Sequence, residues 1–315
     1  MPAPSRAWIP ATSGIRPRNR PRTRAITTTK TPRPTSTSAR RWVAACGNCS
    51  KDHGGRGRRE KPAGEAGWRG RPRLGRRPPA YNPDMCGRYT LAADSEAIAR
   101  RFGVSVPAGL PRRYNIAPSQ DVLAVRERPA GERELVGLQW GLVPFWADEA
   151  AIGNRLVNAR SETAASKPAF RAAFRHRRCL VVADGFYEWQ VIDGRRQPCY
   201  FSLHSGGPFG FAGLWERWDK QGEPLETCTI LTREADEFMR PFHERMPVIV
   251  APELFAAWLA VDPPEPAVLQ QVLKPPSGLL AVRPVSTRVN NVRHDGPECI
   301  APLALQGRLF GDSSS

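Results

Sequence analysis

The chain has 315 residues, a net charge of +17, 40% hydrophobic residues and seven cysteines. No apolar run reaches the roughly 18 residues that a transmembrane helix needs, so a membrane span is excluded. An odd number of cysteines without a regular spacing argues against a disulfide scaffold and favours a reducing, cytoplasmic location. No Gly-rich phosphate loop occurs, which argues against ATP or NAD, and we expect no cofactor and no metal.

The excess positive charge lies in residues 1–84, which we predict to be a disordered leader. They hold 20 Lys and Arg against four Asp and Glu, a net charge of +16, whereas residues 85–315 carry only +1. A stretch rich in Arg, Pro and Gly buries too little apolar surface to offset the entropy lost on ordering. Three origins remain open: a misplaced start codon, which we favour, an organellar transit peptide, or a basic arm that binds nucleic acid. The Cys46-x-x-Cys49 pair has no second pair nearby, so chance explains it better than a zinc knuckle.

Residues 85–310 are predicted to form one α+β domain, followed by a short tail at 311–315. Asp94 is predicted to cap a short helix that ends at Gly103. Apolar alternation then predicts mainly antiparallel strands at 122–127, 134–140, 179–183, 186–191, 199–204, 209–215, 227–232, 246–250 and 280–285. Further helices are predicted at 167–175, 252–260 and 266–273. Many short strands with a few helices indicate a curled or barrel-like sheet.

The predicted domain opens with Met85-Cys86, a sequence typical of a translation start. If Met85 is removed, Cys86 carries a free α-amine beside its thiol. Such a 1,2-aminothiol condenses with an aldehyde to a Schiff base, which the thiol then closes to a five-membered thiazolidine. No internal cysteine can do this, so Cys86 suggests covalent capture of an aldehyde.

Residues capable of chemistry follow in short islands separated by strands. They are RYNIAP at 113–118, WGLVPFW at 140–146, VNARSE at 157–162, DGFYEW at 184–189, FHERMP at 242–247 and VSTRVNN at 285–291. We expect loops at one end of the sheet to bring these islands together. In order and spacing, and with MCGRY at 85–89, they resemble the SRAP family of abasic-site processing proteins from Cys86 to about Val292, nearly the whole of the predicted domain.

The resemblance implies a reversible DNA–protein cross-link, formed as part of an SOS-type response to DNA damage. Cys86 would form the thiazolidine with the aldehyde of an abasic site in single-stranded DNA. Asn158 is expected to position the reacting sugar, and Glu188 to move protons as the amine adds and water leaves. His243 is expected to shuttle protons during Schiff-base formation and ring opening.

The resemblance also implies a DNA-binding surface around these residues. Arg88 and Arg160 are expected to hold phosphates through charged hydrogen bonds. Trp140, Pro144 and Trp146 are expected to stack on bases or to act as a wedge at a duplex end. The other residues predicted to contact DNA are Asn115, Pro118, Ser286 and Asn290. The expected partner is single-stranded DNA or a junction with duplex, bound by a monomer in the bacterial cytosol or nucleoid.

Two other classes of function remain open. One is a thiol peptidase or autopeptidase, for which DNA is incidental, and the other is a non-covalent binder of single-stranded DNA. Individual residues also have structural alternatives: Glu188 facing solvent, or the Trp-rich island forming core. The arginines at 171, 175, 177 and 178 form either a stripe that faces DNA or a solvated helix face. Because residues 85–315 are nearly neutral, nucleic-acid binding requires a local basic patch.

Overall fold

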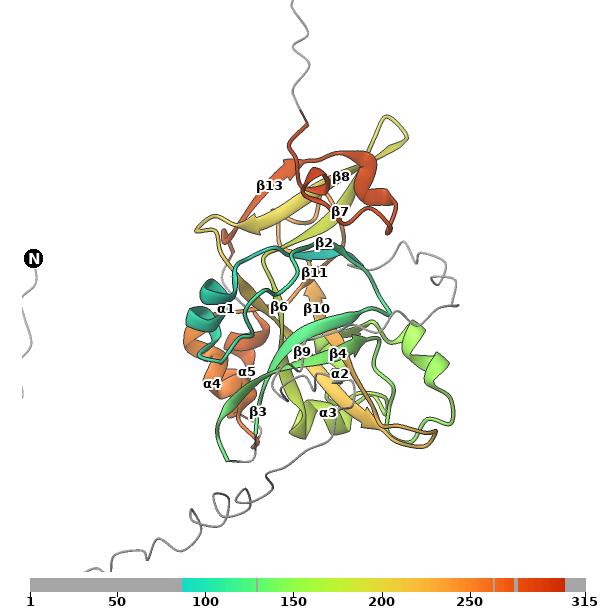
Figure 1. The fold of residues 1–315 in the computed structure, drawn as a ribbon, viewed down its shortest axis with the longest axis vertical. Helices are drawn as coiled ribbons and strands as arrows, with labels where there is room; N and C mark the ends of the chain where they lie inside the picture. Colours follow the sequence, from blue (N-terminus) through green and yellow to red (C-terminus); the bar gives the residue numbers. More distant parts are fainter. Residues whose placement is uncertain (1–86, 129, 263, 275–276, 304–315) are drawn as a thin grey trace, which may run out of the picture. The chain divides into compact units, whose positions relative to one another are not determined.

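The computed structural model describes residues 87–128, 130–262, 264–274 and 277–303 (Figure 1). The predictions for the leader, the Cys46/Cys49 pair, Cys86 and the tail lie outside these residues. The strands are β1 (Tyr89–Leu91), β2 (Arg113–Ile116), β3 (Asp121–Glu127), β4 (Arg133–Trp140), β5 (Asn158–Arg160), β6 (Arg178–Ala183), β7 (Gly185–Ile192), β8 (Arg195–Leu203), β9 (Phe209–Trp218), β10 (Leu225–Glu234), β11 (Arg245–Pro247), β12 (Ile249–Val250) and β13 (Leu280–Pro284). The α-helices are α1 (Ser95–Phe102), α2 (Ser161–Ala164), α3 (Arg171–His176), α4 (Phe255–Leu259) and α5 (Pro266–Leu273), and four 3-10 helices cover Ala150–Arg155, Pro252–Leu254, Thr287–Asn290 and Pro297–Cys299.

The first sheet has five antiparallel strands in the order β13-β8-β7-β1-β2 and lies at the top of Figure 1. Its longest pairing is the β7–β8 hairpin, which turns at Asp193-Gly194. Both turn residues have positive φ, 49° and 73°, as a tight two-residue hairpin turn requires. The short strand β1 pairs with β7 on one side and with β2 on the other. The start of the described domain is therefore inside this sheet.

The second sheet curls into a closed ring. Its strands follow the order β10-β4-β3-β6-β9, and β9 pairs back onto β10. Most pairs are antiparallel, but β10 pairs in parallel with β4 and with β5. Closure removes free edges, which explains how so many short strands form one stable layer. The predicted curled, mainly antiparallel α+β fold is confirmed.

The helices cover the outside of the ring. Asp94 caps α1 by accepting a hydrogen bond from Ala97 N at 2.7 Å, and Gly103 ends the helix with a left-handed φ of 66°. Helices α1, α4 and α5 lie together at the left of Figure 1. Phe102 of α1 stacks on Phe255 of α4 with ring centroids 5.3 Å apart, which joins the two helices through a fully buried aromatic pair. Each such buried aromatic side chain contributes roughly 1.5–3 kcal/mol through burial.

Alternation along β7 separates two buried clusters. Phe186 belongs to the main core between the sheets, whereas Tyr187 and Trp189 point to the opposite face. On that outer face they pack with Val289 and Cys299 of the C-terminal segment. No helix within the described residues has the length and apolar character to cross a membrane.

Candidate functional site

The first described residue, Gly87, lies beside the strand that carries Glu188. Tyr187 N donates a hydrogen bond to Arg88 O at 3.0 Å, and Tyr89 pairs with Phe186. Continuing this antiparallel register by one step sets Gly87 opposite Glu188. Cys86 itself lies outside the described residues, and Gly87, which follows it, is opposite Glu188 in this register.

Glu188 is buried, with 2% of its surface exposed. It shares the inner face of β7 with Phe186, because alternate residues of a strand point to the same side. The alternative in which Glu188 faces solvent is therefore wrong. A carboxylate enclosed in this way is suited to exchange protons with a group brought to it.

Asn158 is linked to the start of β1 through Trp140. The indole N–H of Trp140 donates to Val157 O at 2.8 Å, immediately before Asn158. The Trp140 ring also packs edge-on against Tyr89, with centroids 5.4 Å apart. Asn158 is 8% exposed and is held in β5, in register with Ile230 of β10. Trp140 thus fixes the short strand that carries the amide relative to β1.

His243 lies in the turn between β10 and β11. The preceding residue, Phe242, packs edge-on against Phe201, and Phe201 stacks on Phe186, with centroid distances of 5.1 and 5.0 Å. This aromatic row joins the histidine turn to the inner face of β7, which also carries Glu188. Three separate elements, β5, β7 and the β10–β11 turn, are therefore connected to the strand that begins after Gly87.

The backbone of Arg245 lies against the His243 ring. Nδ1 of His243 is 2.9 Å from Arg245 N and 2.9 Å from Arg245 O. When Nδ1 is deprotonated it accepts from the N–H, and when it is protonated it donates to the carbonyl. The same backbone unit therefore serves both protonation states, and a change of charge on His243 requires no new partner.

The Arg245 side chain is itself fixed from two directions. Its guanidinium binds Glu162 at the start of α2, and it also donates to Thr232 O at 2.6 Å. These hydrogen bonds with Arg245 hold the pKa of Glu162 down to about 2. Glu162 is consequently ionised throughout the neutral range, and the charge pair persists around His243.

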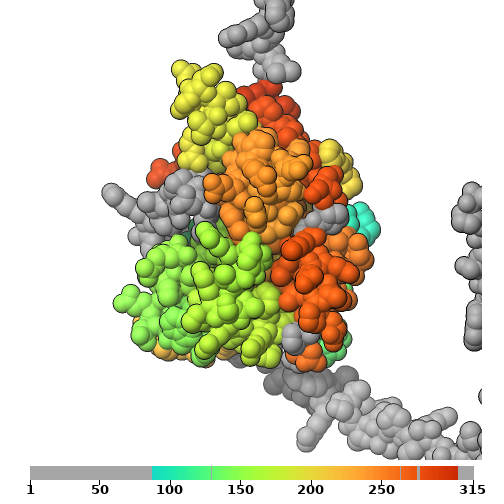
Figure 2. Space-filling model, turned by 180° about the vertical axis from the view of Figure 1, so that it is seen from behind, coloured from blue at the N-terminus to red at the C-terminus, as the bar shows by residue number. Residues whose placement is uncertain are grey.

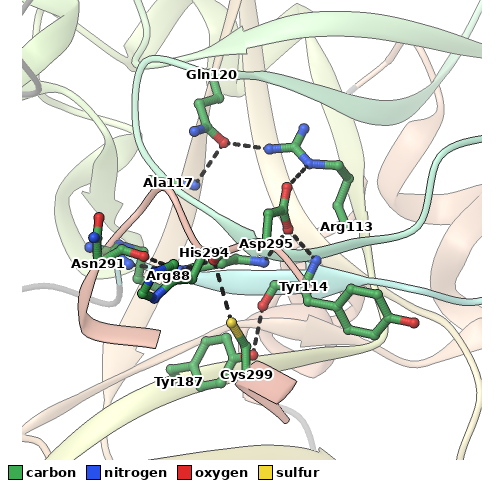
Figure 3. A network of polar contacts seen from close by, with 11 residues as sticks. Arg88, Arg113, Tyr114, Ala117, Gln120, Tyr187, Asn291, His294, Asp295 and Cys299 are labelled. Carbon is green, nitrogen blue, oxygen red and sulfur yellow. Dashed lines mark hydrogen bonds and ion pairs between the residues drawn. The ribbon is translucent and has the colours of Figure 1, made fainter. Parts of the chain in front are cut away.

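A second polar network fixes the C-terminal segment to β2 (Figure 3). Asn115 is fully buried and donates through Nδ2 to Val289 O, Asn291 O and His294 O at 3.0, 3.1 and 2.8 Å. Asp295 accepts from the backbone N–H of Tyr114 and of Asn115 and pairs with Arg113. Asn115 therefore acts here as a clamp on the loop.

Arg88 belongs to the same network. It is 8% exposed, and its guanidinium donates to Asn115 Oδ1 at 2.8 Å and to Val289 O at 2.9 Å. This position differs from the solvent-facing one expected of a phosphate contact. In the structure the Arg88 side chain joins the segment before β1 to the C-terminal loop that contains Val289.

The other residues predicted to contact DNA divide into buried and accessible groups. Trp140 and Pro144 are buried, and Trp140 serves the core, contrary to the stacking role expected of it. Trp146 is 43% exposed, Phe145 beside it is 53% exposed, and Arg160 is also exposed. The remaining positions are half-buried or involved in local bonds: Pro118 is half-buried, Ser286 accepts from Arg288 N at 3.3 Å, and Asn290 accepts from Trp189 Nε1 at 2.7 Å.

Sequence reasoning missed Glu162, Asp184, Arg245 and Asp295. Asp184, between β6 and β7, accepts hydrogen bonds from Thr90 and from the backbone N–H of Ala92 and Ala93, which anchors β1 at its far end. Glu162, Asp184 and Arg245 lie in the sequence islands given above, and that position is the signal that could have identified them. Asp295 lies outside these islands. Among the residues that the structure describes, no group of three or more His, Cys, Asp or Glu side chains is placed to hold a metal ion.

The curled fold occurs in known proteins. A crystal structure of a protein from Bacteroides thetaiotaomicron has a similar fold, with a TM-score of 0.62 and 23% identity, over 70% of this chain and all of that one. Residues 85–292 match the family described as SOS response associated peptidase (SRAP). The chain therefore belongs to the SRAP family.

Relatives within the family are named abasic site processing proteins. Protein YoqW of Bacillus subtilis (strain 168) is 39% identical over 222 residues, covering 69% of this chain and 99% of that protein. Protein HMCES of Gallus gallus is 32% identical over 265 residues, covering 70% of this chain and 79% of that protein. Protein YedK of Escherichia coli (strain K12) is 29% identical over 227 residues, covering 70% of this chain and all of that protein.

Proposed function

We propose that this protein captures abasic sites in single-stranded DNA by forming a thiazolidine with Cys86, once Cys86 is the N-terminal residue. The observation that supports this most directly is the position of Gly87 opposite the buried Glu188. A buried carboxylate suited to proton transfer therefore lies opposite the residue that follows the proposed amine. The names of the relatives, which refer to abasic sites, support the choice of substrate.

The chemistry balances without any other reactant. The neutral α-amine attacks C1′ of the ring-opened deoxyribose, and the resulting carbinolamine loses water to give a Schiff base. The thiol sulfur then adds to the imine carbon while its proton passes to the nitrogen, which closes the thiazolidine. One aldehyde and one aminothiol thus give one adduct and one water. With a reference pKa of about 7.7–8.0, the amine has a usable neutral fraction near pH 7.

Each buried polar side chain has a role in this sequence. Glu188 accepts the proton released when the amine adds and returns it to the leaving hydroxyl. His243 opens the sugar ring by proton transfer, and the Arg245 backbone supports both of its charge states. Asn158 orients the sugar through its amide.

The family description also names a peptidase, and this bears on how the amine is exposed. When the chain is made with residues before Cys86, the Met85–Cys86 bond must be cut before any thiazolidine forms. The thiol of Cys86 would attack the Met85 carbonyl, which moves the acyl group from nitrogen to sulfur and frees the amine, and water would then hydrolyse the thioester, with Glu188 and His243 transferring the protons. We propose self-cleavage as the step that precedes capture.

Intact-mass measurement tests both steps at once. The protein is produced from its own gene and is incubated with an oligonucleotide that holds one abasic site, then denatured. We expect a mass that starts at Cys86 and rises by the oligonucleotide less one water. A chain made to begin at Cys86 that also gives no adduct would reject the proposal.

Matched variants locate the chemistry. Cys86→Ala should abolish the adduct and leave non-covalent binding of intact single-stranded DNA unchanged, whereas Cys299→Ala should leave the adduct intact because Cys299 is internal. Glu188→Gln should slow adduct formation by roughly 100-fold at unchanged DNA affinity. Glu226→Gln, at a partly buried ion pair with Arg126, is the control for loss of a carboxylate. Equal effects of the two glutamate substitutions would contradict the role of Glu188.

A further inference from the structure

The positive charge of the described domain is concentrated in one stretch of the chain. Residues 150–178 hold seven Lys and Arg and a single acidic residue, Glu162. The rest of residues 85–315 holds 20 basic and 25 acidic residues. A nearly neutral domain is therefore divided into a strongly basic segment and a moderately acidic remainder, and only a local patch of this kind can attract a polyanion.

Two of the seven cations have structural roles. Arg177 pairs with Glu216 at 2.6 Å. Arg178 is 3% exposed and donates to carbonyls at the ends of two helices, among them Phe174 O and Trp258 O. The arginine stripe considered from the sequence is thereby divided, because only Arg171 and Arg175 of its four members are exposed.

The other five cations are exposed, and none forms an ion pair with another residue in the part of the chain that the structure describes. They are Arg155, Arg160, Lys167, Arg171 and Arg175. Elsewhere several exposed arginines face carboxylates, as Arg128 faces Glu134 and Arg100 faces Glu96. A solvated helix face ordinarily carries both positive and negative side chains. A run of five cations without an ion pair therefore indicates a surface that binds an anionic partner.

The last three cations follow one another along a helical path. Arg171 N donates to Lys167 O at 2.9 Å, so the helical turn begins at Lys167 and continues into α3. Spacing by four residues puts Lys167, Arg171 and Arg175 on one side of that path, in a row roughly 12 Å long. Phe170 and Phe174 of the same turns are buried, which directs the cations outward.

Arg160 links this row, along the chain, to the candidate site. Arg160 follows Asn158 by two residues in β5, which pairs with β10, and β10 in turn pairs with β11 next to His243. In the space-filling view, the green surface of this part of the chain lies directly below the orange surface of the segment that holds the β10–β11 turn (Figure 2). A strand bound at Asn158 thus has the exposed Arg160 next to it, and the row of cations begins seven residues further along the chain.

We propose that Arg160, Lys167, Arg171 and Arg175 form a track for the phosphodiester backbone of the DNA strand that flanks the captured residue. This inference rests on the proposed function, because it assigns a path to the partner of that site. The track reads no sequence, since phosphate contacts fix the position and direction of a strand without distinguishing bases. Its role is to hold the flanking strand while the slower covalent steps proceed.

Salt dependence measures the track directly. For single strands, each neutralised phosphate adds about −0.7 to the slope of log K against log [salt]. The triple variant Lys167→Gln/Arg171→Gln/Arg175→Gln should therefore reduce the magnitude of the slope by about 2 for an undamaged oligonucleotide of roughly 15 residues. Binding is measured by fluorescence anisotropy with the full chain, whose remaining cations contribute equally to every variant.

Two controls make the result specific. Arg195→Gln/Arg217→Gln/Lys274→Gln removes three exposed cations outside the track and should leave the slope unchanged. Lys167→Arg/Arg171→Lys/Arg175→Lys keeps the charges and should retain the wild-type slope. A track variant whose slope changes no more than that of the control triple would overturn the proposal.

A second measurement separates the track from the capture chemistry. With an abasic trinucleotide, which has no flank to reach α3, the track variant should form adduct at the wild-type rate. With the abasic site in a 15-residue strand at subsaturating DNA, its adduct formation should slow with the lost affinity. Wild-type protein that forms no adduct would contradict the proposed function and leave the salt-slope test valid, whereas normal adduct with an unchanged slope would overturn only the track.

Discussion

Arg245 and Glu162 form a bidentate ion pair, in which Nη1 to Oε1 and Nη2 to Oε2 are both 2.8 Å. The pair joins the start of α2 to β11, 83 residues later, and Arg245 in turn provides the backbone partner of the His243 ring. Two parallel hydrogen bonds between a guanidinium and a carboxylate fix the relative orientation of the two groups as well as the distance between them. The histidine is therefore positioned by a carboxylate that does not touch it.

Replacing Glu162 by Gln should destabilise the domain in a pH-dependent way. The folded pKa of Glu162 is lowered to about 2 from 4.5, so its stabilising contribution is fully present above pH 4.5 and is lost as the pH falls towards 2. Since the carboxylate is half-exposed, we expect a loss of about 1 kcal/mol at pH 7 and no difference near pH 2. Urea unfolding at several pH values measures this. Glu96→Gln, in an exposed pair with Arg100, should have little effect, and a loss for Glu162→Gln that does not vary with pH would contradict the assignment.

Trp140→Phe tests whether the indole ring of Trp140 packs in the core or stacks on DNA. The substitution leaves Val157 O without its donor and creates a small cavity, so we expect a loss of about 2–4 kcal/mol in unfolding free energy. The salt slope of DNA binding should not change. Trp146→Ala is the matched exposed substitution, and it should leave stability within about 0.5 kcal/mol while weakening binding to single-stranded DNA. The reverse pattern would make Trp140 the stacking residue.

Asp184→Asn should alter how stability varies with pH. Burial raises the pKa of Asp184 above its ordinary value of 3.8, against the hydrogen bonds from Thr90, Ala92 and Ala93, which lower it. A raised folded pKa means that the stabilising contribution is present below pH 3.8 and is lost as the pH rises through the folded value. Wild type should therefore lose stability relative to Asp184→Asn as the pH increases from about 4. Thermal melts of both proteins between pH 3 and pH 7 measure the difference, and a gain by wild type would show that the three donors outweigh burial.

Asp295→Ala should loosen the C-terminal loop more than the rest of the domain. The substitution leaves the backbone N–H groups of Tyr114 and Asn115 without their acceptor and removes the partner of Arg113. We expect a loss of about 2–4 kcal/mol and faster hydrogen exchange of residues 287–295. Glu298→Ala, three residues later, is the control and should change neither quantity by a comparable amount. Uniform acceleration of exchange over the whole domain would argue against a local clamp.

Long elements with a regular pattern were predictable from the sequence, and short ones were not. The alternation in β3 and β4 and the capping signals at Asp94 and Gly103 are local, so the predicted hairpin and helix are confirmed within one or two residues. Strands β1, β2 and β5 have only three or four residues each and exist because neighbouring strands pair with them. Asn158 was outside every predicted strand for this reason, although it lies on β5, whereas Glu188 lies within the strand predicted at 186–191.

The candidate site, like the fold, was predictable from the sequence only where the signal is local. Motifs led to the prediction of Asn158, Glu188 and His243, because each belongs to a residue pattern that is contiguous in the chain. The pairing of Glu162 with Arg245, and the inward position of Arg88, depend on which segments the fold brings together. Nothing local in the sequence distinguishes Arg88, which is buried, from Arg160, which is exposed.

The hydrogen bond from Arg88 to Val289 O joins residues that are 201 positions apart. The ribosome adds Arg88 long before Val289. During synthesis the segment after Cys86 therefore lacks the hydrogen bond that joins it to the C-terminal loop. The proposed capture site is consequently completed among the last events of biogenesis. A nascent chain should therefore be unable to trap aldehydes on the ribosome, and competence should arise only when the C-terminal loop has emerged and docked.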